Sequence, residues 1–263
     1  MRPVVMGVLN VTPDSFFDGG RYELTDLAVA HAERMVEDGA AIIDVGGEST
    51  RPGAVAISAA EEIARVLPVI RRVSAMRAVV SVDTSKPEVM RAAVDVGARM
   101  INDVRALREP GALEVAAATG VAVCLMHMRG HPRSMQDDPI YGDVTREVAA
   151  FLLERVGCCQ RAGVDTAALV LDPGFGFGKT LEHNLQLLRG LRQIVAIGPP
   201  VLVGFSRKSM VGALTGRDTE DRIPGSMALA MLALQSGARI IRVHDVAPTI
   251  DAIRVWSAVE GGA

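Results

Sequence analysis

Cysteine is scarce in this chain of 263 residues, which contains only Cys124, Cys158 and Cys159. The last two are neighbours on one predicted helix, and none of the three has the spacing of a metal-binding motif. We therefore expect small, buried hydrophobic side chains in a reducing compartment, and no zinc-type cluster.

Long hydrophobic runs are also missing. The longest clean apolar run, residues 227–234, is far shorter than the roughly 20 residues that a membrane span needs. The first residues lead directly to Asn10 and Asp14, without the apolar segment of a secretory signal. We therefore expect a soluble cytoplasmic protein that does not interact with a membrane.

The chain has little net charge, with a formal value of -3. Such a balance argues against a broad surface for nucleic acids or membranes, so any site for an anionic ligand must be local. The hydrophobic content of 49% and the charged content of 22% are typical of a globular enzyme. The pattern of a Ser/His/Asp triad is not visible either.

What the sequence does contain is a repeated unit of apolar strand, polar loop and helix. The predicted strands are residues 4–9, 41–45, 79–82, 100–101, 121–126, 169–171, 201–203 and 240–241. Strands that alternate with helices pair in parallel, and eight such units close into a (β/α)₈ TIM barrel. Because such barrels take roughly 250 residues, we expect residues 1–263 to form a single domain.

An open, doubly wound sheet is the alternative fold. It is less favoured because the Gly-x-Gly-x-x-Gly turn that is typical of this fold is missing after the first strand. Locally, Ser58 with Glu61 and Ser85 with Glu88 predict capping boxes at the second and third helices. One helix is expected across Leu185 to Leu191, after the sixth strand. Residues 128–142 are a functional loop or a locally mobile segment.

The segment from Asp172 to Lys179 is central to the chain. It reads Asp-Pro-Gly-Phe-Gly-Phe-Gly-Lys and directly follows a short apolar strand. A carboxylate and three glycines at the end of a strand predict a loop whose backbone comes close to a ligand. Ordinary turn chemistry explains this octapeptide equally well when it is taken alone.

Polar side chains follow nearly every predicted strand, and this recurrence favours a functional interpretation. They are Asn10, Glu48, Asp83, Asn102, Asp172, Lys208, Arg242 and His244. Each taken singly has a structural explanation, since Asn and Asp often cap helices. In a barrel, however, all strands end on the face that carries the active site. We therefore predict the active site there.

The types of these residues divide into two groups. Asp83, Asn102, Asp172 and Lys208 offer donors and acceptors for the edge of a flat heterocycle. Asn10, Arg51, Arg242 and His244 suit a phosphate or diphosphate, with Asn10 as a ligand for magnesium. Residues 206–209 open a helix whose positive end suits a second anion, such as a carboxylate.

Six motifs carry a resemblance to a known family. They are Met-Gly-Val-Leu-Asn-Val-Thr-Pro-Asp-Ser-Phe (6–16), Asp-Val-Gly-Gly-Glu-Ser-Thr-Arg-Pro-Gly (44–53), Ser-Val-Asp-Thr-Ser (81–85), the glycine-rich octapeptide (172–179), Ser-Arg-Lys-Ser (206–209) and Arg-Val-His-Asp (242–245). In this order and at this length they resemble the bacterial dihydropteroate synthase family, whose members bind pterins.

The resemblance implies a transferase of folate biosynthesis. Its implied substrates are 6-hydroxymethyl-7,8-dihydropterin diphosphate and 4-aminobenzoate, and its implied products are 7,8-dihydropteroate and diphosphate. It further implies Mg²⁺, sulfonamides as inhibitors and a homodimer formed through the last helices. Because no activated nucleophile is visible, we expect the diphosphate to leave before the amine attacks.

The family's roles are carried over to matching positions. The pterin would be held by Asp83, Asn102, Asp172 and Lys208, and the diphosphate by Asn10, Arg51, Arg242 and His244, with Asn10 on the metal. The 4-aminobenzoate site would be bordered by Phe16, Thr50, Arg51, Pro52, Phe177 and Ser209. The expected catalytic residues are Asp18, Arg51, Lys208, Arg242 and His244. Loops 11–20 and 46–57 are expected to order only with diphosphate and magnesium, so that 4-aminobenzoate binds last.

Two departures from the family stand out. Phe17 occupies a position where the family often has Ser, which leaves loop packing and sulfonamide affinity open. The chain also begins almost at its first strand, whereas relatives usually carry a segment that covers the bottom of the barrel. We expect stability rather than catalysis to depend on that segment.

Three other functions are weighed against this one. A lyase would use Lys208 as a Schiff-base nucleophile, and a related pterin-binding barrel transfers a methyl group to a corrinoid. A non-catalytic pterin-binding paralogue would have lost loop residues such as Asp18 and Arg51, which are present here. A working synthase is therefore favoured.

Overall fold

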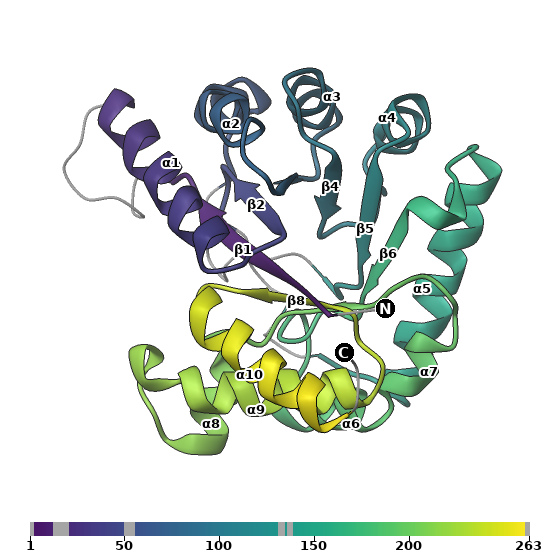
Figure 1. Cartoon of the computed structure of the whole chain (residues 1–263). Helices are drawn as coiled ribbons and strands as arrows, with labels where there is room; N and C mark the ends of the chain where they lie inside the picture. The colour runs from purple at the N-terminus through teal and green to yellow at the C-terminus, as the bar shows by residue number, and fades with distance from the viewer. Residues whose placement is uncertain (1–2, 13–20, 50–55, 131–134, 136–138, 261–263) are drawn as a thin grey trace.

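The chain forms a barrel of eight parallel strands surrounded by helices (Figure 1). This computed structural model describes residues 3–12, 21–49, 56–130, 135 and 139–260. The strands are β1 (Val4–Asn10), β2 (Ile42–Gly46), β3 (Val79–Asp83), β4 (Met100–Asp103), β5 (Ala122–Met126), β6 (Leu169–Asp172), β7 (Leu202–Val203) and β8 (Ile240–Val243).

The sheet closes because its first and last strands are neighbours. β1 pairs with β2 on one side and with β8 on the other, where Val5 lies opposite Ile241. Between β6 and β7 a parallel bridge joins Leu171 to Val201. The predicted (β/α)₈ barrel is therefore confirmed. The open doubly wound alternative is wrong, because an open sheet would leave two edge strands without a partner.

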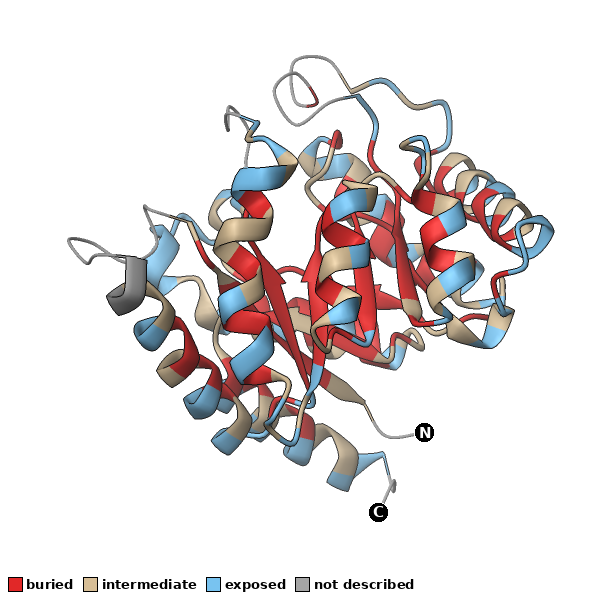
Figure 2. Cartoon of the chain, turned by 90° about the horizontal axis from the view of Figure 1, so that it is seen from above, coloured by how far each residue is buried: buried red, intermediate tan, exposed pale blue. Residues whose placement is uncertain are grey.

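The strands are short and apolar because both of their faces are buried (Figure 2). On the inner face, an apolar layer fills the bottom of the barrel. It consists of Met6, Ile42, Met100, Cys124, Val170, Leu202 and Ile240. Successive side chains of a strand alternate between its faces. Asn102, Asp172 and Arg242 each stand two residues beyond a member of this layer, so they also point inward, above it.

All three cysteines are free, and two of them are buried. Cys124 belongs to the inner apolar layer, where burial raises the pKa of its thiol well above the ordinary value. Cys159 is buried on the outer side of the barrel, while Cys158 is half-buried. The prediction of small buried hydrophobic side chains is thus confirmed for Cys124 and Cys159.

The helices cover the outside of the barrel and number ten among the described residues, two more than predicted. They are α1 (Arg21–Glu37), α2 (Ala59–Val73), α3 (Pro87–Asp95), α4 (Ala112–Thr119), α5 (Val144–Arg161), α6 (Leu181–Arg189), α7 (Leu191–Val195), α8 (Ser209–Thr215), α9 (Ile223–Gln235) and α10 (Val246–Val259). Gly190 separates α6 from α7, so the single helix predicted across this region is wrong. No helix in the described ranges has the length and apolar character to cross a bilayer.

One of the two predicted capping boxes is partly confirmed. The hydroxyl of Ser58 accepts the N–H of Glu61 at 3.2 Å, while the Glu61 carboxylate binds Arg65 instead of closing the box. At α3 the prediction is wrong, because the N-cap is Lys86 and has no side-chain cap. Ser85 donates its hydroxyl to the buried carboxylate of Asp103 instead, since a buried acceptor has more to gain from a hydrogen bond than an exposed helix end.

Candidate active site

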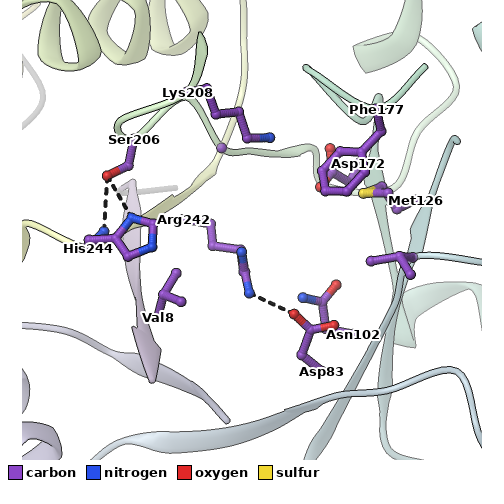
Figure 3. Close-up of a pocket in the computed structure, with 12 residues that line it drawn as sticks. Val8, Asp83, Asn102, Met126, Asp172, Phe177, Ser206, Lys208, Arg242 and His244 are labelled. Atoms are coloured by element: carbon purple, nitrogen blue, oxygen red, sulfur yellow. Dashed lines mark hydrogen bonds and ion pairs between the residues drawn. The ribbon is translucent and has the colours of Figure 1, made fainter. Parts of the chain in front are cut away.

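One pocket opens at the carboxyl end of the strands, above the inner apolar layer (Figure 3). Seven residues singled out from the sequence line it: Asp83, Asn102, Asp172, Phe177, Lys208, Arg242 and His244. Val8, Val104, Met126, Gly204 and Ser206 complete its wall. Segments far apart in the chain meet here, such as Arg242 and Asp83, which are 159 residues apart, because parallel strands all end on this side.

Other residues predicted for the site are placed elsewhere. Glu48 pairs with Lys86, which also binds the buried Glu62, so Glu48 is not part of the pocket wall. Ser209 is the exposed first residue of α8, and Asn10 ends β1 without lining the pocket. The predicted residues Phe16, Asp18, Thr50, Arg51 and Pro52, together with Phe17, lie outside the described residues.

Asp172 and Lys208 place opposite charges at one side of the pocket. Asp172 Oδ1 accepts the N–H of Gly174 at 2.7 Å, and Lys208 donates to the carbonyl of Phe175. Burial raises the pKa of Asp172, and the ammonium of Lys208 opposes that rise. Burial likewise lowers the pKa of Lys208 to about 8. The Lys208 Nζ lies 4.7 Å from the centre of the Phe177 ring.

On the other side of the pocket, Arg242 bridges two carboxylates from neighbouring strands. Its Nε donates to Asp44 Oδ2 at 2.7 Å, and its Nη2 donates to Asp83 Oδ2 at 2.8 Å. Asn102 Nδ2 donates to the same Asp44 oxygen at 2.9 Å, which leaves its amide oxygen and its second N–H for a ligand. Burial raises the pKa of Asp83 to about 7; Arg242 opposes the rise and Asp44 adds to it.

Asp44 is a site residue that the sequence reasoning missed. Its side chain is 0% exposed, and its Oδ1 has no hydrogen-bond partner among the described residues. A carboxylate is costly to bury unless it is paired. The sequence did carry a signal for it, because Asp44 is a charged residue inside the apolar run of β2, between Ile43 and Val45. The structure shows that Asp44 holds Asn102 and Arg242 in place.

Ser206 was expected only as part of the anion-binding segment 206–209, and in the structure it orients His244. The Ser206 hydroxyl lies 3.0 Å from His244 Nδ1 and accepts the backbone N–H of His244 at 3.2 Å. The residues that follow these two are also bonded to each other, since Arg207 donates two hydrogen bonds to Asp245. These contacts tie the loop after β7 to the loop after β8. The ring of His244 therefore faces the pocket in a defined orientation (Figure 3).

The glycines of the 172–179 loop are required chiefly by neighbouring backbone. Gly174, Gly176 and Gly178 all have positive φ, at 69°, 81° and 62°. A Cβ on Gly174 would lie 1.9 Å from the carbonyl oxygen of His127, and one on Gly178 would lie 2.4 Å from that of Arg129. At Gly174 and Gly178 the backbone of the loop after β5 therefore requires glycine by itself. The expectation that this loop comes close to a ligand stays a prediction.

The surroundings of Asn10 fit a magnesium ion shared with a diphosphate. A Cβ on Gly46 would lie 3.6 Å from Asn10 Oδ1 and 3.9 Å from Asp83 Oδ2, so glycine leaves space between the two oxygens. Mg²⁺ takes oxygen ligands and commonly combines one or two protein groups with phosphate oxygens. Within the described ranges no cluster of three or more His, Cys, Asp or Glu forms a metal site. Asn10, through its Oδ1, is a residue that could hold such an ion.

Comparisons with known proteins identify the family of this chain. Residues 6–244 match the family model described as pterin binding enzyme. The dihydropteroate synthase of Escherichia coli (strain K12) is 54% identical over 258 residues, which cover 98% of this chain and 92% of that protein.

Solved structures are similar over the same length. Dihydropteroate synthase from Xanthomonas albilineans with 4-aminobenzoic acid has a TM-score of 0.94 at 54% identity, covering 98% of this chain and 93% of that one. The same organism's enzyme in complex with 7,8-dihydropteroate has a TM-score of 0.91 at 51% identity, covering 98% and 94%. The Yersinia pestis enzyme in complex with a sulfonamide drug has a TM-score of 0.94 at 50% identity, covering 99% and 95%.

A barrel with a polar pocket at its carboxyl end and this family match define a pterin-binding enzyme. The chain belongs to the dihydropteroate synthases, which are transferases of folate biosynthesis. The lyase, the corrinoid methyltransferase and the non-catalytic paralogue are therefore not supported as alternatives.

Proposed function

We propose that the enzyme joins 6-hydroxymethyl-7,8-dihydropterin diphosphate to 4-aminobenzoate and releases 7,8-dihydropteroate and diphosphate. The observation that carries this proposal is the convergence of Asp83, Asn102, Asp172 and Lys208 on one pocket. Carboxylates accept the N–H groups of a pterin edge, while an ammonium donates to its carbonyl and ring nitrogens. The complexes of relatives with 4-aminobenzoic acid and 7,8-dihydropteroate support the same substrates.

The apolar part of the pocket suits the two faces of a flat ring. Val104 and Met126 belong to a buried cluster with Met128 and Met135, against which Phe177 packs. Met135 lies in the 128–142 segment, so part of that segment supports the pocket wall. A flat heterocycle placed here would contact sulfur and aromatic surface with its faces and hydrogen-bonding groups with its edge.

The proposed mechanism is dissociative. The C–O bond to the diphosphate breaks first, the leaving group takes the electron pair, and a methylene cation conjugated with the pterin ring remains. The amine of 4-aminobenzoate then forms the C–N bond and releases a proton to solvent. Arg242 and His244, with Arg51, would bind the leaving group, and the Asp172 carboxylate, with Asp18, would stabilise the cation. Magnesium held by Asn10 would offset negative charge on the diphosphate.

An assay of diphosphate release tests this function. Release is expected when the pterin diphosphate and 4-aminobenzoate are supplied together, with 7,8-dihydropteroate as the second product. Release that proceeds equally well without 4-aminobenzoate, and forms no C–N bond, would show a hydrolase instead. A sulfonamide is expected to compete with 4-aminobenzoate, as the complex of the Yersinia pestis enzyme supports.

Asp172→Asn is expected to weaken pterin binding more than about tenfold. The amide presents a donor where the pterin also presents donors, and a charge-assisted hydrogen bond is worth roughly 1.5–3 kcal/mol. Calorimetric titration with 6-hydroxymethyl-7,8-dihydropterin measures the change, and Asp251→Asn on the exposed face of α10 is the control. Unchanged affinity in a folded Asp172 variant would remove this carboxylate from the pterin site.

The pKa values of the pocket predict a narrow pH optimum. Asp83 accepts hydrogen bonds when it is ionised, and Lys208 donates as a cation. Asp83 takes up a proton below about pH 7, and Lys208 loses one above about pH 8. We expect kcat/KM for the pterin diphosphate to fall on both sides of this range. Lys208→Arg should remove the alkaline decline, because guanidinium remains charged; a flat wild-type profile would contradict the assignment.

We further propose that the enzyme is a cytoplasmic homodimer. Three free cysteines support a reducing compartment. Leu232 on α9 and Val255 and Val259 on α10 are exposed apolar side chains, which favour burial against a second copy. Sedimentation velocity measures the state directly, and a monomer at every concentration would contradict the dimer.

A further inference from the structure

A buried lysine behind the pocket takes no part in the mechanism above. Lys179 is 2% exposed and does not line the pocket. Its Nζ donates to the carbonyl oxygens of Gly174 at 2.8 Å and Phe177 at 3.1 Å, and lies 3.0 Å from His127 Nδ1. Burial lowers the pKa of Lys179 to about 7, and the charge of Asp172 opposes that fall. In its protonated form the side chain has three N–H groups, and these three acceptors match them.

The contacts of Lys179 close the turn that forms one wall of the pocket. Phe177 N–H donates to the carbonyl of Gly174 at 3.1 Å, so Lys179 binds both ends of the residue 174–177 turn. Between those ends, the carbonyl of Phe175 accepts a hydrogen bond from Lys208. Lys179 therefore holds the two ends of the turn, while the pocket residue Lys208 binds its middle.

His127 completes the anchor and connects it to β6. Its backbone N–H donates to the carbonyl of Asp172 at 2.9 Å, and its ring packs edge-on against Phe151 at 5.0 Å. Burial and the charge of Lys179 lower the pKa of His127 to about 2, so the ring is neutral and Nδ1 accepts a hydrogen bond. The tautomer required has its proton on Nε2.

We propose that Lys179 is a positioning residue for the pterin pocket. It fixes the conformation of the 174–177 turn, which in turn places the Phe177 ring, the Phe175 carbonyl that holds Lys208, and the Gly174 N–H that orients Asp172. A buried ammonium is expensive to desolvate, and an apolar side chain would fill the same space without that cost. All three of its acceptors lie in or against this one turn. The inference rests on the proposed pterin site.

The test compares Lys179→Met with a variant that lowers stability elsewhere. Met fills a similar volume but cannot donate, so pterin affinity is expected to fall at least tenfold, with KM for the pterin diphosphate rising more than kcat changes. Val73→Ala, in the buried last residue of α2, creates a cavity away from the pocket and should leave both values unchanged. Affinity is titrated with 6-hydroxymethyl-7,8-dihydropterin.

A second pair of variants keeps the inference testable if Lys179→Met does not fold. His127→Gln retains an acceptor for the ammonium and is expected to bind pterin nearly as wild type does, whereas His127→Leu should bind at least several-fold more weakly. Wild-type affinity in Lys179→Met or in His127→Leu would overturn the positioning role. So would an equal loss in Val73→Ala. Failure of the wild-type enzyme to bind the pterin would instead overturn the proposed function itself.

Discussion

Arg242→Ala is expected to lower kcat/KM for the pterin diphosphate by at least about 30-fold, since truncating one partner of a buried charge pair costs about 2–5 kcal/mol. The substitution removes the predicted partner of the diphosphate. It also leaves Asp44 and Asp83 without the cation that they share at 2.7 and 2.8 Å. The pKa of Asp83, already raised to about 7, should then rise further.

The size of the loss should depend on the ligand. A pterin without phosphates keeps its contacts with Asp172 and Lys208, so its affinity should fall much less than kcat/KM for the diphosphate substrate. Steady-state kinetics and calorimetry provide the two values. Arg254→Ala is a matched control, because Arg254 is an exposed arginine paired with Asp251, and such pairs contribute little. Equal losses for both ligands would show that Arg242 serves the pterin rather than the diphosphate.

Asp44→Asn is expected to lower the free energy of unfolding by about 3 kcal/mol, because it breaks an ion pair whose carboxylate is fully buried. The amide has no charge for Arg242 and offers a second donor to a site that holds the donors of Arg242 and Asn102. Urea unfolding measures the loss. Asp26→Asn is the matched control, since Asp26 pairs with Arg72 on the surface.

The same variant makes a prediction about pH that a general loss of stability would not make. The Asp44 charge raises the pKa of Asp83, and Arg242 lowers it. In the Asp44→Asn variant the carboxylate charge that raises the pKa of Asp83 is gone, and Arg242 has Asp83 as its remaining carboxylate partner. Both changes lower the pKa of Asp83. The acid side of the kcat/KM profile should therefore move below its wild-type position near pH 7. If the acid side of the kcat/KM profile stays at the wild-type pH or moves to a higher pH, Asp83 is not the group that titrates there.

The barrel itself was predictable from the chain because its signals are local. Short apolar runs such as residues 169–171 alternate with helical stripes, and each run ends at a polar residue. The number of runs and the parallel pairing rule leave few topologies. The side on which the pocket lies follows from the same rule, which is why Asp83, Asn102 and Arg242 were expected together.

Predictions from local sequence patterns were wrong where a side chain binds a partner far away in the chain. Ser85 carries the sequence signature of a helix cap, yet Asp103 takes its hydroxyl. Glu48 lies two residues beyond the end of β2, yet Lys86 binds it away from the pocket. Each time a buried or charged partner contributes more free energy than the local pattern, and that partner cannot be identified from sequence spacing.

The sequence by itself determined the order of strands and helices, the inward direction of alternate side chains and the set of polar residues at the strand ends, because these depend on neighbours a few positions apart. Only the tertiary structure decided how those residues are held. Asp44 joins Asn102 to Arg242 across three strands, and Lys179 anchors the turn that carries Phe177. Both are buried charges, and their partners depend on which backbone and side-chain groups the closed barrel brings within hydrogen-bonding distance.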